Sequence, residues 1–396
     1  MRDYPKFIIT AKGEKFIKTG HVWVFGEEVT KVEGDYQNGD IVDVVSAKGK
    51  YIGSGFVNDN SKIRVRIIST NANDKFDEAF WERRVHYALE YRRQVMGDDF
   101  GCCRLIFGEA DGFPGLTVDR FNDVLVAQVL SLGTELRKGT IFNLLLKELP
   151  DICGIYERND VKIRELEGMA QGKGWFGDTV SKVSTQIVEN GIKYNVDFIN
   201  GQKTGYFLDQ KYNRQAVAKL AKGRKILDCF THTGSFALNA LKGGAERVTA
   251  VDISAEALAM AKENAKLNGW ELEIVEANVF DLLTKMTDEH NKDYDFIILD
   301  PPAFTKSGAT VAGATRGYKE INRKAMKLLP RGGYLATCSC SHFMKEDFFV
   351  QMLKDAAKDA AVSLRQVEAR QQAPDHPILW NVPETNYLKF YIFQVV

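Results

Sequence analysis

The chain has 396 residues and no net charge, because its 53 lysines and arginines are balanced by 53 aspartates and glutamates. The molecule as a whole therefore has no electrostatic attraction for nucleic acid, and any RNA or DNA binding must come from a local basic face. No apolar run reaches the length of a membrane span, and charges are scattered through residues 1–20, unlike in a secretory signal peptide. These absences predict a cytoplasmic protein.

Cysteines are few, and their spacing does not suit a structural role. The six cysteines lack the paired C-x-x-C motifs of a zinc site and are too few for a disulfide scaffold. They are Cys102, Cys103, Cys153, Cys229, Cys338 and Cys340. We therefore expect free thiols and no metal site.

The segment from Lys225 to Asp252, KILDCFTHTGSFALNALKGGAERVTAVD, has a strand–helix–strand pattern, and the turn after its first strand has a single glycine. The first strand ends on Asp228, a turn with Thr233 and Gly234 opens the helix, and the second strand ends on Asp252. Dinucleotide sites normally place G-x-G-x-x-G in such a turn, so a pyrophosphate would be poorly held here. Two carboxylates fit a cationic, phosphate-free adenosine cofactor such as S-adenosylmethionine (SAM) better. From these residues alone, another nucleotide or a purely structural unit stays open.

The remaining composition, 44% hydrophobic and 27% charged, is that of an ordinary globular protein with room for two or three domains. We predict three, at residues 1–72, 73–190 and 191–396. The first contains short β-rich runs such as HVWVF, YIGSGFV and IRVRIIS between glycines, which is typical of a small β-barrel. The second combines a helix over 76–96 with strands that flank a turn at 111–115, which indicates an α+β domain.

Basic side chains in the first domain could form a face for RNA. They are Lys12, Lys15, Lys18, His21, Arg64 and Arg66. Acidic residues such as Glu27 and Asp40 nearly offset them, so an ordinary solvated surface is the alternative.

The third domain alternates regularly between strands and helices, which predicts a doubly wound, mostly parallel α/β sheet. The runs LEIVEA, YDFIILD and GYLATCS supply its third, fourth and fifth strands, and LRQVEAR and NYLKFYIFQVV form a closing hairpin with an antiparallel strand. Upstream, the loop GQKTGYFLDQ carries Tyr206 and Phe207. Such a loop can lie over the ligand of the next β-α unit, although a domain linker would look similar.

Two polar groups follow neighbouring strands of this predicted sheet. Asp300 ends the fourth strand before Pro301 and Pro302, and Cys338 ends the fifth. In a sheet ordered 3-2-1-4-5 these strands are adjacent, so the two side chains converge beside the switch point where a cofactor binds. A lone cysteine at a strand end is usually a small buried hydrophobe. Its pairing with Asp300 favours a functional thiol.

This pair suits methylation of a pyrimidine at carbon. C5 of cytosine is a weak nucleophile until a thiolate adds at C6 while an acidic group hydrogen-bonds N3. Cys338 is the candidate nucleophile and Asp300 the candidate N3 partner. A base must then remove the C5 proton, and the sequence leaves Cys340, His342 and Lys306 open for that role.

The motifs together resemble one family over essentially the whole chain. ADGFPGLTVDRF, GQKTGYFLDQ, ILDCFTHTG, LDPPAF, TCSCSH and APDHPILWNVPETNYLKF look like those of the bacterial large-subunit ribosomal RNA cytosine-5 methyltransferase I family. The resemblance implies an RNA-binding PUA domain, a small α+β middle domain and a class I SAM methyltransferase domain with a Rossmann-like fold. It also implies 23S ribosomal RNA as the substrate and a homodimer.

The resemblance further implies which residues hold SAM. The loop after the first strand should wrap its methionine end, Asp252 should accept hydrogen bonds from the ribose hydroxyls, and Asn278 should accept one from the adenine amino group. The full set of expected cofactor contacts is Asp228, Phe230, Thr233, Gly234, Asp252, Ile253, Asn278, Val279, Asp300 and Phe207.

Three positions depart from the pattern of related enzymes. Asn278 stands where many have aspartate, and His232 stands where a tyrosine is expected. Ala303 replaces the second cysteine of better-known RNA cytosine-5 methyltransferases, so the elimination step must proceed differently.

Two other functions stay open from the sequence. One is SAM-dependent methylation of another base, either uracil at C5, which also needs a cysteine, or guanine, which does not. The other is a catalytically silent RNA-binding assembly factor.

Overall fold

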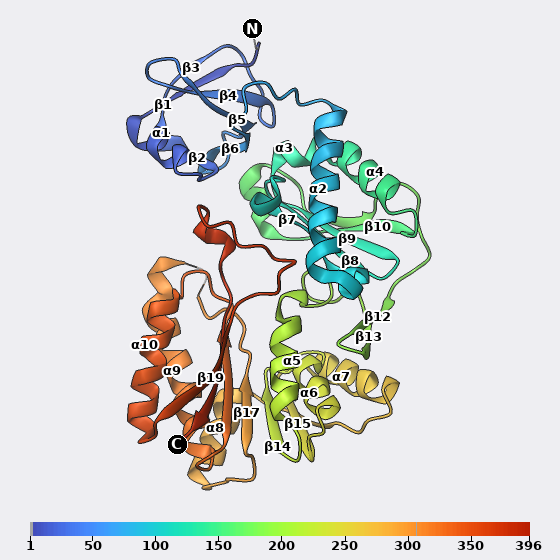
Figure 1. Ribbon diagram of the computed structural model, residues 1–396, viewed down its shortest axis with the longest axis vertical. Helices are drawn as coiled ribbons and strands as arrows, with labels where there is room; N and C mark the ends of the chain where they lie inside the picture. Colours follow the sequence, from blue (N-terminus) through green and yellow to red (C-terminus); the bar gives the residue numbers. More distant parts are fainter. Residues whose placement is uncertain (1–2, 306) are drawn as a thin grey trace. The chain divides into compact units, whose positions relative to one another are not determined.

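The computed structural model of the chain describes residues 3–305 and 307–396 (Figure 1). It divides into two compact units. The first comprises Met1–Ile187, Val196–Leu208 and Pro374–Thr385, and the second comprises Val188–Asn195, Asp209–Ala373 and Asn386–Val396. The finer division into three domains, with boundaries near residues 72 and 190, stays a prediction.

The first unit begins with a six-stranded sheet in the order β2-β6-β5-β4-β1-β3 (Figure 1). The strands are β1 (Lys6–Ile9), β2 (Trp23–Phe25), β3 (Val29–Glu33), β4 (Ile41–Ser46), β5 (Tyr51–Val57) and β6 (Ile63–Ser69), with helix α1 (Ala11–Lys18) after β1. Their apolar side chains, among them Phe7, Val24 and Val44, form a buried core. This is the β-rich domain that the amino-terminal runs predicted.

The proposed basic face of this sheet is largely neutralised. His21 is buried, lies 3.2 Å from a Glu384 oxygen through Nε2 and stacks on a neighbouring ring. Arg66 donates to Glu109 at 3.2 Å and to Glu167 at 2.9 Å. His21 and Arg66 therefore have acidic partners inside the unit, whereas Lys12 and Lys15 are exposed. RNA contact by this face stays a prediction.

The rest of the first unit is α+β, as predicted. Helix α2 (Glu78–Met96) starts at Asp77, whose carboxylate accepts from the Phe80 amide at 3.1 Å. A five-stranded sheet follows in the order β11-β10-β9-β8-β7. Its strands are β7 (Cys102–Phe107), β8 (Leu116–Phe121), β9 (Val124–Val129), β10 (Gly154–Asn159) and β11 (Gly172–Trp175), and helices α3 (Leu132–Glu135) and α4 (Lys138–Glu148) connect β9 to β10.

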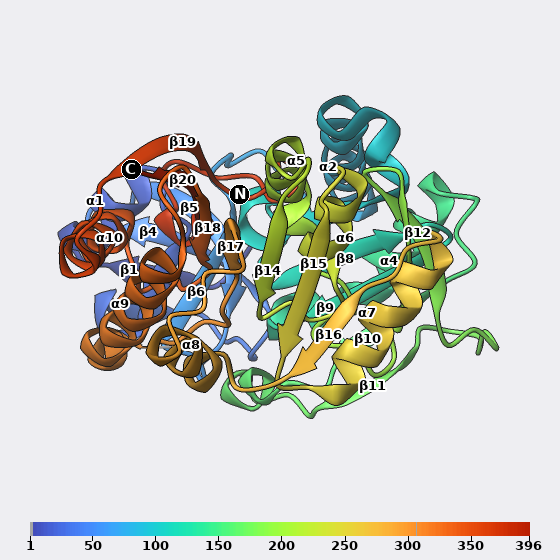
Figure 2. The same cartoon turned by 90° about the horizontal axis from the view of Figure 1, so that it is seen from below.

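The second unit is built on a seven-stranded sheet in the order β16-β15-β14-β17-β18-β20-β19 (Figure 2). Its strands are β14 (Lys225–Cys229), β15 (Arg247–Asp252), β16 (Glu273–Glu276), β17 (Phe296–Leu299), β18 (Tyr334–Ser339), β19 (Leu364–Arg370) and β20 (Lys389–Val395). The first five pair in parallel, and β20 is antiparallel to both β18 and β19. The predicted order and closing hairpin are therefore confirmed. A separate hairpin of β12 (Thr185–Glu189) and β13 (Ile192–Val196) precedes the sheet.

Helices flank this sheet in two groups (Figure 2). One group is α5 (Lys211–Leu220), α6 (Ser235–Lys242) and α7 (Ala255–Leu267). The other is α8 (Val279–Asp288), α9 (Val311–Leu328) and α10 (Glu346–Ala360), which share one buried core with the sheet. Each parallel strand is followed by a loop at its carboxyl end, and ligands of such sheets bind at these loops.

Close packing of α6 on α5 gives a stability prediction at Gly243. A Cβ there would lie 2.1 Å from the Ala218 carbonyl oxygen, which is backbone and cannot move aside. We expect Gly243→Ala to destabilise the protein by about 1–3 kcal/mol through overpacking. As a control, a Cβ at Gly313 in helix α9 would have the Arg316 guanidinium at 3.9 Å as its neighbour among the described residues. Gly313→Ala should therefore stabilise the protein by about 0.5–1 kcal/mol. Urea-unfolding midpoints that move the same way in both variants would contradict this account.

Candidate active site

Neighbouring strands bring Asp300 and Cys338 together, as the sequence predicted. Leu299 at the end of β17 is level with Thr337 in β18, so the residues that follow lie side by side. The Cys338 thiol donates to Asp300 Oδ1 at 2.9 Å and lies 3.5 Å from the Leu299 carbonyl oxygen. Cys338 is only 1% exposed, so a substrate has to enter the site for the thiol to react.

The electrostatics of this pair place the proton on sulfur at rest. Burial raises the pKa of Asp300 to about 6, although the hydrogen bond from Cys338 lowers it in part. Burial and the nearby Asp300 charge raise the pKa of the Cys338 thiol well above its usual value. Near neutral pH the site therefore contains an ionised Asp300 that accepts from a neutral thiol. The carboxylate is placed to take the thiol proton when sulfur attacks.

The loop after β14 has an unusual backbone. Phe230 and His232 adopt positive φ of 64° and 51°, and Gly234 follows with φ 83° as the residue before helix α6. Asp228, immediately before this loop, is fully buried, and its Oδ2 accepts from the Thr231 hydroxyl at 2.6 Å and the Ala237 amide at 3.0 Å. Asp228 Oδ1 is buried and has no hydrogen-bond partner among residues 3–305 and 307–396.

That oxygen provides a test of whether the loop fits SAM. An ionised carboxylate oxygen that is buried without a partner is costly. Burial raises the pKa of Asp228 to about 7, so the free protein carries this group partly protonated. Burial likewise lowers the pKa of His232, which keeps that ring neutral beside the loop. A cationic ligand would supply the missing partner, so the residues present fit SAM.

Three more of the expected cofactor contacts, Asp252, Ile253 and Asn278, lie at or just after the ends of strands β15 and β16. Asp252 accepts from the His232 amide at 2.9 Å and the Ser254 amide at 3.0 Å, which fixes its carboxylate beside the loop. Ile253 is 70% exposed. Asn278 caps helix α8 by accepting from the Phe280 amide at 2.9 Å.

Three further residues of the expected set differ in their surroundings. Thr233 is buried in the loop, and Val279 is buried in the core at the start of α8. Phe207 belongs to the first unit, where Lys203 Nζ lies 5.1 Å from its ring centroid. Its contact with a cofactor stays a prediction.

Two residues that the sequence reasoning did not single out lie beside the pair. Gln210 Nε2 donates to Asp300 Oδ1 at 3.1 Å and to Cys338 Sγ at 3.4 Å. Lys389 in β20 donates to the Ser341 and Tyr387 carbonyls at 2.7 and 2.8 Å, and burial lowers its pKa to about 8. The only sequence signal for either was its place in the GQKTGYFLDQ and NYLKF motifs.

Two of the three candidate acceptors for the C5 proton differ in their exposure. Cys340 is partly buried and His342 is exposed. Lys306 lies outside the described residues.

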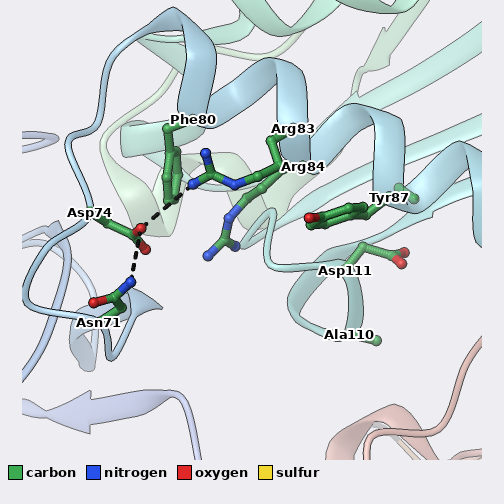
Figure 3. Close-up of a pocket in the computed structure, with 9 residues that line it drawn as sticks. Asn71, Asp74, Phe80, Arg83, Arg84, Tyr87, Ala110 and Asp111 are labelled. Atoms are coloured by element: carbon green, nitrogen blue, oxygen red, sulfur yellow. Dashed lines mark hydrogen bonds and ion pairs between the residues drawn. The ribbon is translucent and has the colours of Figure 1, made fainter.

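A cavity of about 460 Å³ lies in the first unit, and none of the candidate site residues that the structure describes lines it (Figure 3). Arg83 pairs with Asp74 at 3.5 Å, Asn71 donates to Asp74 at 3.3 Å, and Arg84 donates to the Gly112 carbonyl at 2.8 Å. Because these polar side chains are bound to each other or to backbone, we regard the cavity as structural rather than catalytic.

Metal and membrane features were sought over residues 3–305 and 307–396. In that part of the chain no cluster of three or more histidine, cysteine, aspartate or glutamate side chains could hold a metal ion. None of the helices described there combines the length and apolarity needed to cross a membrane.

Two family models match separate segments of the chain. A family model described as S-adenosylmethionine-dependent methyltransferase matches residues 173–394, and a PUA-like domain model matches residues 7–70. The ribosomal RNA large subunit methyltransferase I of Klebsiella pneumoniae (strain 342) is 39% identical over 397 residues, covering 99% of each chain. The protein of the same name from Erwinia tasmaniensis is 41% identical over 396 residues, covering 98% of this chain and 99% of that one.

Solved structures agree on the fold. One from Streptococcus mutans, provisionally assigned as a SAM-dependent methyltransferase, has a TM-score of 0.84 at 21% identity and covers 98% of this chain and 100% of that chain. A second, a methyltransferase assigned in the same provisional way and complexed with SAH, has a TM-score of 0.85 at 21% identity with the same coverage.

Proposed function

Because the chain belongs to the ribosomal RNA large subunit methyltransferase I family of SAM-dependent methyltransferases, we propose that it methylates C5 of a cytosine in 23S ribosomal RNA. The observation that carries this proposal is the 2.9 Å hydrogen bond from the Cys338 thiol to Asp300. A thiol and a carboxyl group in contact are what addition at C6 and proton transfer to N3 require.

Asp300 serves first as a base and then as an acid. As the S–C6 bond forms, the thiol proton passes to Asp300, and electron density moves from the C5–C6 double bond through C4 to N3. Asp300 then gives that proton to N3, which leaves C5 as a nucleophilic enamine carbon. After methylation, a base takes the C5 proton and the S–C6 bond breaks with its electron pair going to sulfur. N3 returns its proton through Asp300 to that sulfur, which restores both the ring and the thiol. A buried cytosine-binding position at the strand ends requires the base to be unstacked from its RNA.

SAM, when bound, supplies an electrophilic methyl group. The chain's own part would be to hold that cofactor and neutralise its charge. Asp228 and Asp252 would provide the two carboxylates for this, because they lie in the neighbouring parallel strands β14 and β15. The His232 amide donates to Asp252 and the Ala237 amide to Asp228.

The test is methyl transfer from labelled SAM to 23S ribosomal RNA, with the product nucleosides identified by mass spectrometry. We expect 5-methylcytidine alone. Appearance of 5-methyluridine or a methylated guanosine would assign another base. RNA binding without methyl transfer would indicate an assembly factor.

The PUA-like domain and the large-subunit RNA named for the relatives support ribosomal RNA as the partner. We also propose a cytoplasmic homodimer, on the resemblance alone. Light scattering after size-exclusion chromatography tests its mass, with a monomeric mass contradicting it.

The raised pKa of Asp228 predicts that SAM binds more tightly as pH rises. Below its pKa of about 7 the carboxyl group of the free protein is protonated, and a cationic ligand requires the ionised form. Affinity should therefore increase roughly tenfold per pH unit below 7 and level off above it, with a proton released on binding. Calorimetric titration between about pH 6 and 8 in buffers of different ionisation enthalpy measures both.

Asp228→Asn is the control for this titration, because it keeps the size of the side chain but cannot ionise. Its SAM affinity should be lower, and any pH dependence that remains belongs to the ligand. Equal pH dependence in the wild type and the variant would remove Asp228 from the binding step.

A further inference from the structure

Gln210 is buried at the end of the turn Leu208–Gln210 and touches both reacting groups. Its amide nitrogen donates to Asp300 Oδ1 at 3.1 Å and to Cys338 Sγ at 3.4 Å. A primary amide has two N–H groups, so both bonds can form at once. The side chain thus bridges the proton donor and the proton acceptor of the proposed reaction.

A chain of hydrogen bonds determines which way this amide points. Arg370 Nε donates to Asn213 Oδ1 at 3.2 Å, and Asn213 Nδ2 donates to Gln210 Oε1 at 2.6 Å and to the Gln371 carbonyl oxygen at 3.3 Å. A guanidinium can only donate and a carbonyl can only accept, so Asn213 cannot be flipped without losing both bonds. Its nitrogen must face Gln210, and the Gln210 nitrogen must then face Asp300 and Cys338.

We propose that Gln210 is a positioning residue that holds Asp300 and Cys338 in reacting geometry and stabilises the developing thiolate, with Asn213 and Arg370 fixing the direction of its amide. This proposal rests on the proposed function, in which Cys338 adds to C6. As the thiol proton leaves, the bond from Gln210 to sulfur strengthens because its acceptor becomes charged. The bond to Asp300 keeps the acceptor oxygen directed at the thiol.

Other charged groups also act on the pair. Asp209 and Arg214 act on Asp300, and Cys340 and Lys389 act on Cys338. Gln210 contacts both groups directly through its amide nitrogen.

The experiment follows formation of the covalent complex itself. The probe is 23S ribosomal RNA transcribed with 5-fluorocytidine in place of cytidine, incubated with SAM and the full-length protein. Fluorine at C5 cannot leave as a proton does, so the Cys338–C6 bond persists and the complex is retained on a denaturing gel. Its rate of formation is measured over a range of pH, with SAM affinity measured in parallel.

We expect Gln210→Met to slow complex formation about 10–100-fold, because a hydrogen bond to a charged group is lost. The rise of the rate with pH should also move to higher pH. Its SAM affinity should equal that of the wild type. Gln215→Met is the matched control, because Gln215 lies on α5 and its amide also donates to a side chain, that of Asn190 at 2.6 Å. It should form the complex at the wild-type rate.

Asn213→Asp tests the orienting chain. Aspartate can still accept from Arg370 but cannot donate to Gln210, so we expect an intermediate loss of about tenfold. Since Asn213 acts through Gln210, the double variant with Gln210→Met should be no slower than Gln210→Met alone.

If Gln210→Met fails to bind SAM, Gln210→Glu replaces it, because a carboxylate still accepts from Asn213 while its charge opposes the thiolate. A wild-type rate in whichever variant binds SAM overturns the proposal. Additive losses in the double variant overturn the role of Asn213. If the wild type methylates ordinary RNA but forms no complex with the fluorinated RNA, the covalent mechanism fails instead.

Discussion

Cys338→Ala is expected to lower methylation of 23S ribosomal RNA by at least about 10³-fold, as removal of a covalent nucleophile does in other enzymes. The reason is that cytosine C5 cannot attack a methyl group until a nucleophile has added at C6. The thiol that would add is buried beside Asp300. Transfer of label from SAM to RNA measures the rate.

A second buried thiol provides the control for Cys338. Cys103 is fully buried in the first unit, where its sulfur lies 3.4 Å from the Phe100 carbonyl oxygen. Cys103→Ala should retain methylation at close to the wild-type rate. Wild-type methylation by Cys338→Ala would instead mean that the methyl group is transferred without a covalent adduct.

Asp300→Asn is expected to lower the rate by about 10²–10⁴-fold, the range for loss of a general acid–base group. The amide keeps the size of the carboxyl group but can neither take the Cys338 proton nor pass it to N3. Because the pKa of Asp300 is about 6 and its ionised form is the one that accepts this proton, the wild-type rate should rise through pH 6. The variant should lack that rise.

The same substitution at the opposite end of β17 tests whether the effect is specific. Asp295 precedes Phe296, and its backbone amide donates to the Lys225 carbonyl at 3.0 Å. Asp295→Asn should keep both the rate and its rise with pH. An equal loss in the two variants would show that the strand, not the acid–base group, had been damaged.

The proximity of Asp300 and Cys338 was predictable because it follows from strand order alone. Neighbouring parallel strands end at the same edge of a sheet. Leu299 at the end of β17 lies opposite Thr337 in β18, as this rule requires. The closing hairpin was equally predictable, because the two runs LRQVEAR and NYLKFYIFQVV are joined by a segment too short for a further β-α unit. Neither inference needed any knowledge of side-chain packing.

Gln210 could not be predicted in the same way. It lies 90 positions before Asp300 and 128 before Cys338, on a turn rather than on a strand of the sheet. No periodicity links such positions, and the amide side chain has no distinctive chemistry until its partners are known. The ion pairs of the amino-terminal basic residues could not be predicted for a related reason, since composition does not show that Arg66 is bound by Glu109 and Glu167.

Keeping Cys338 protonated at rest protects the enzyme from its own reagent. A free thiolate reacts readily with electrophiles and oxidants, whereas a buried neutral thiol does not. A site that stores an activated methyl donor would otherwise convert its cysteine to an inert thioether before RNA arrived. In the proposed mechanism, loss of the thiol proton to Asp300 is coupled to attack on C6, so the nucleophile would become available only when a cytosine is there to receive it.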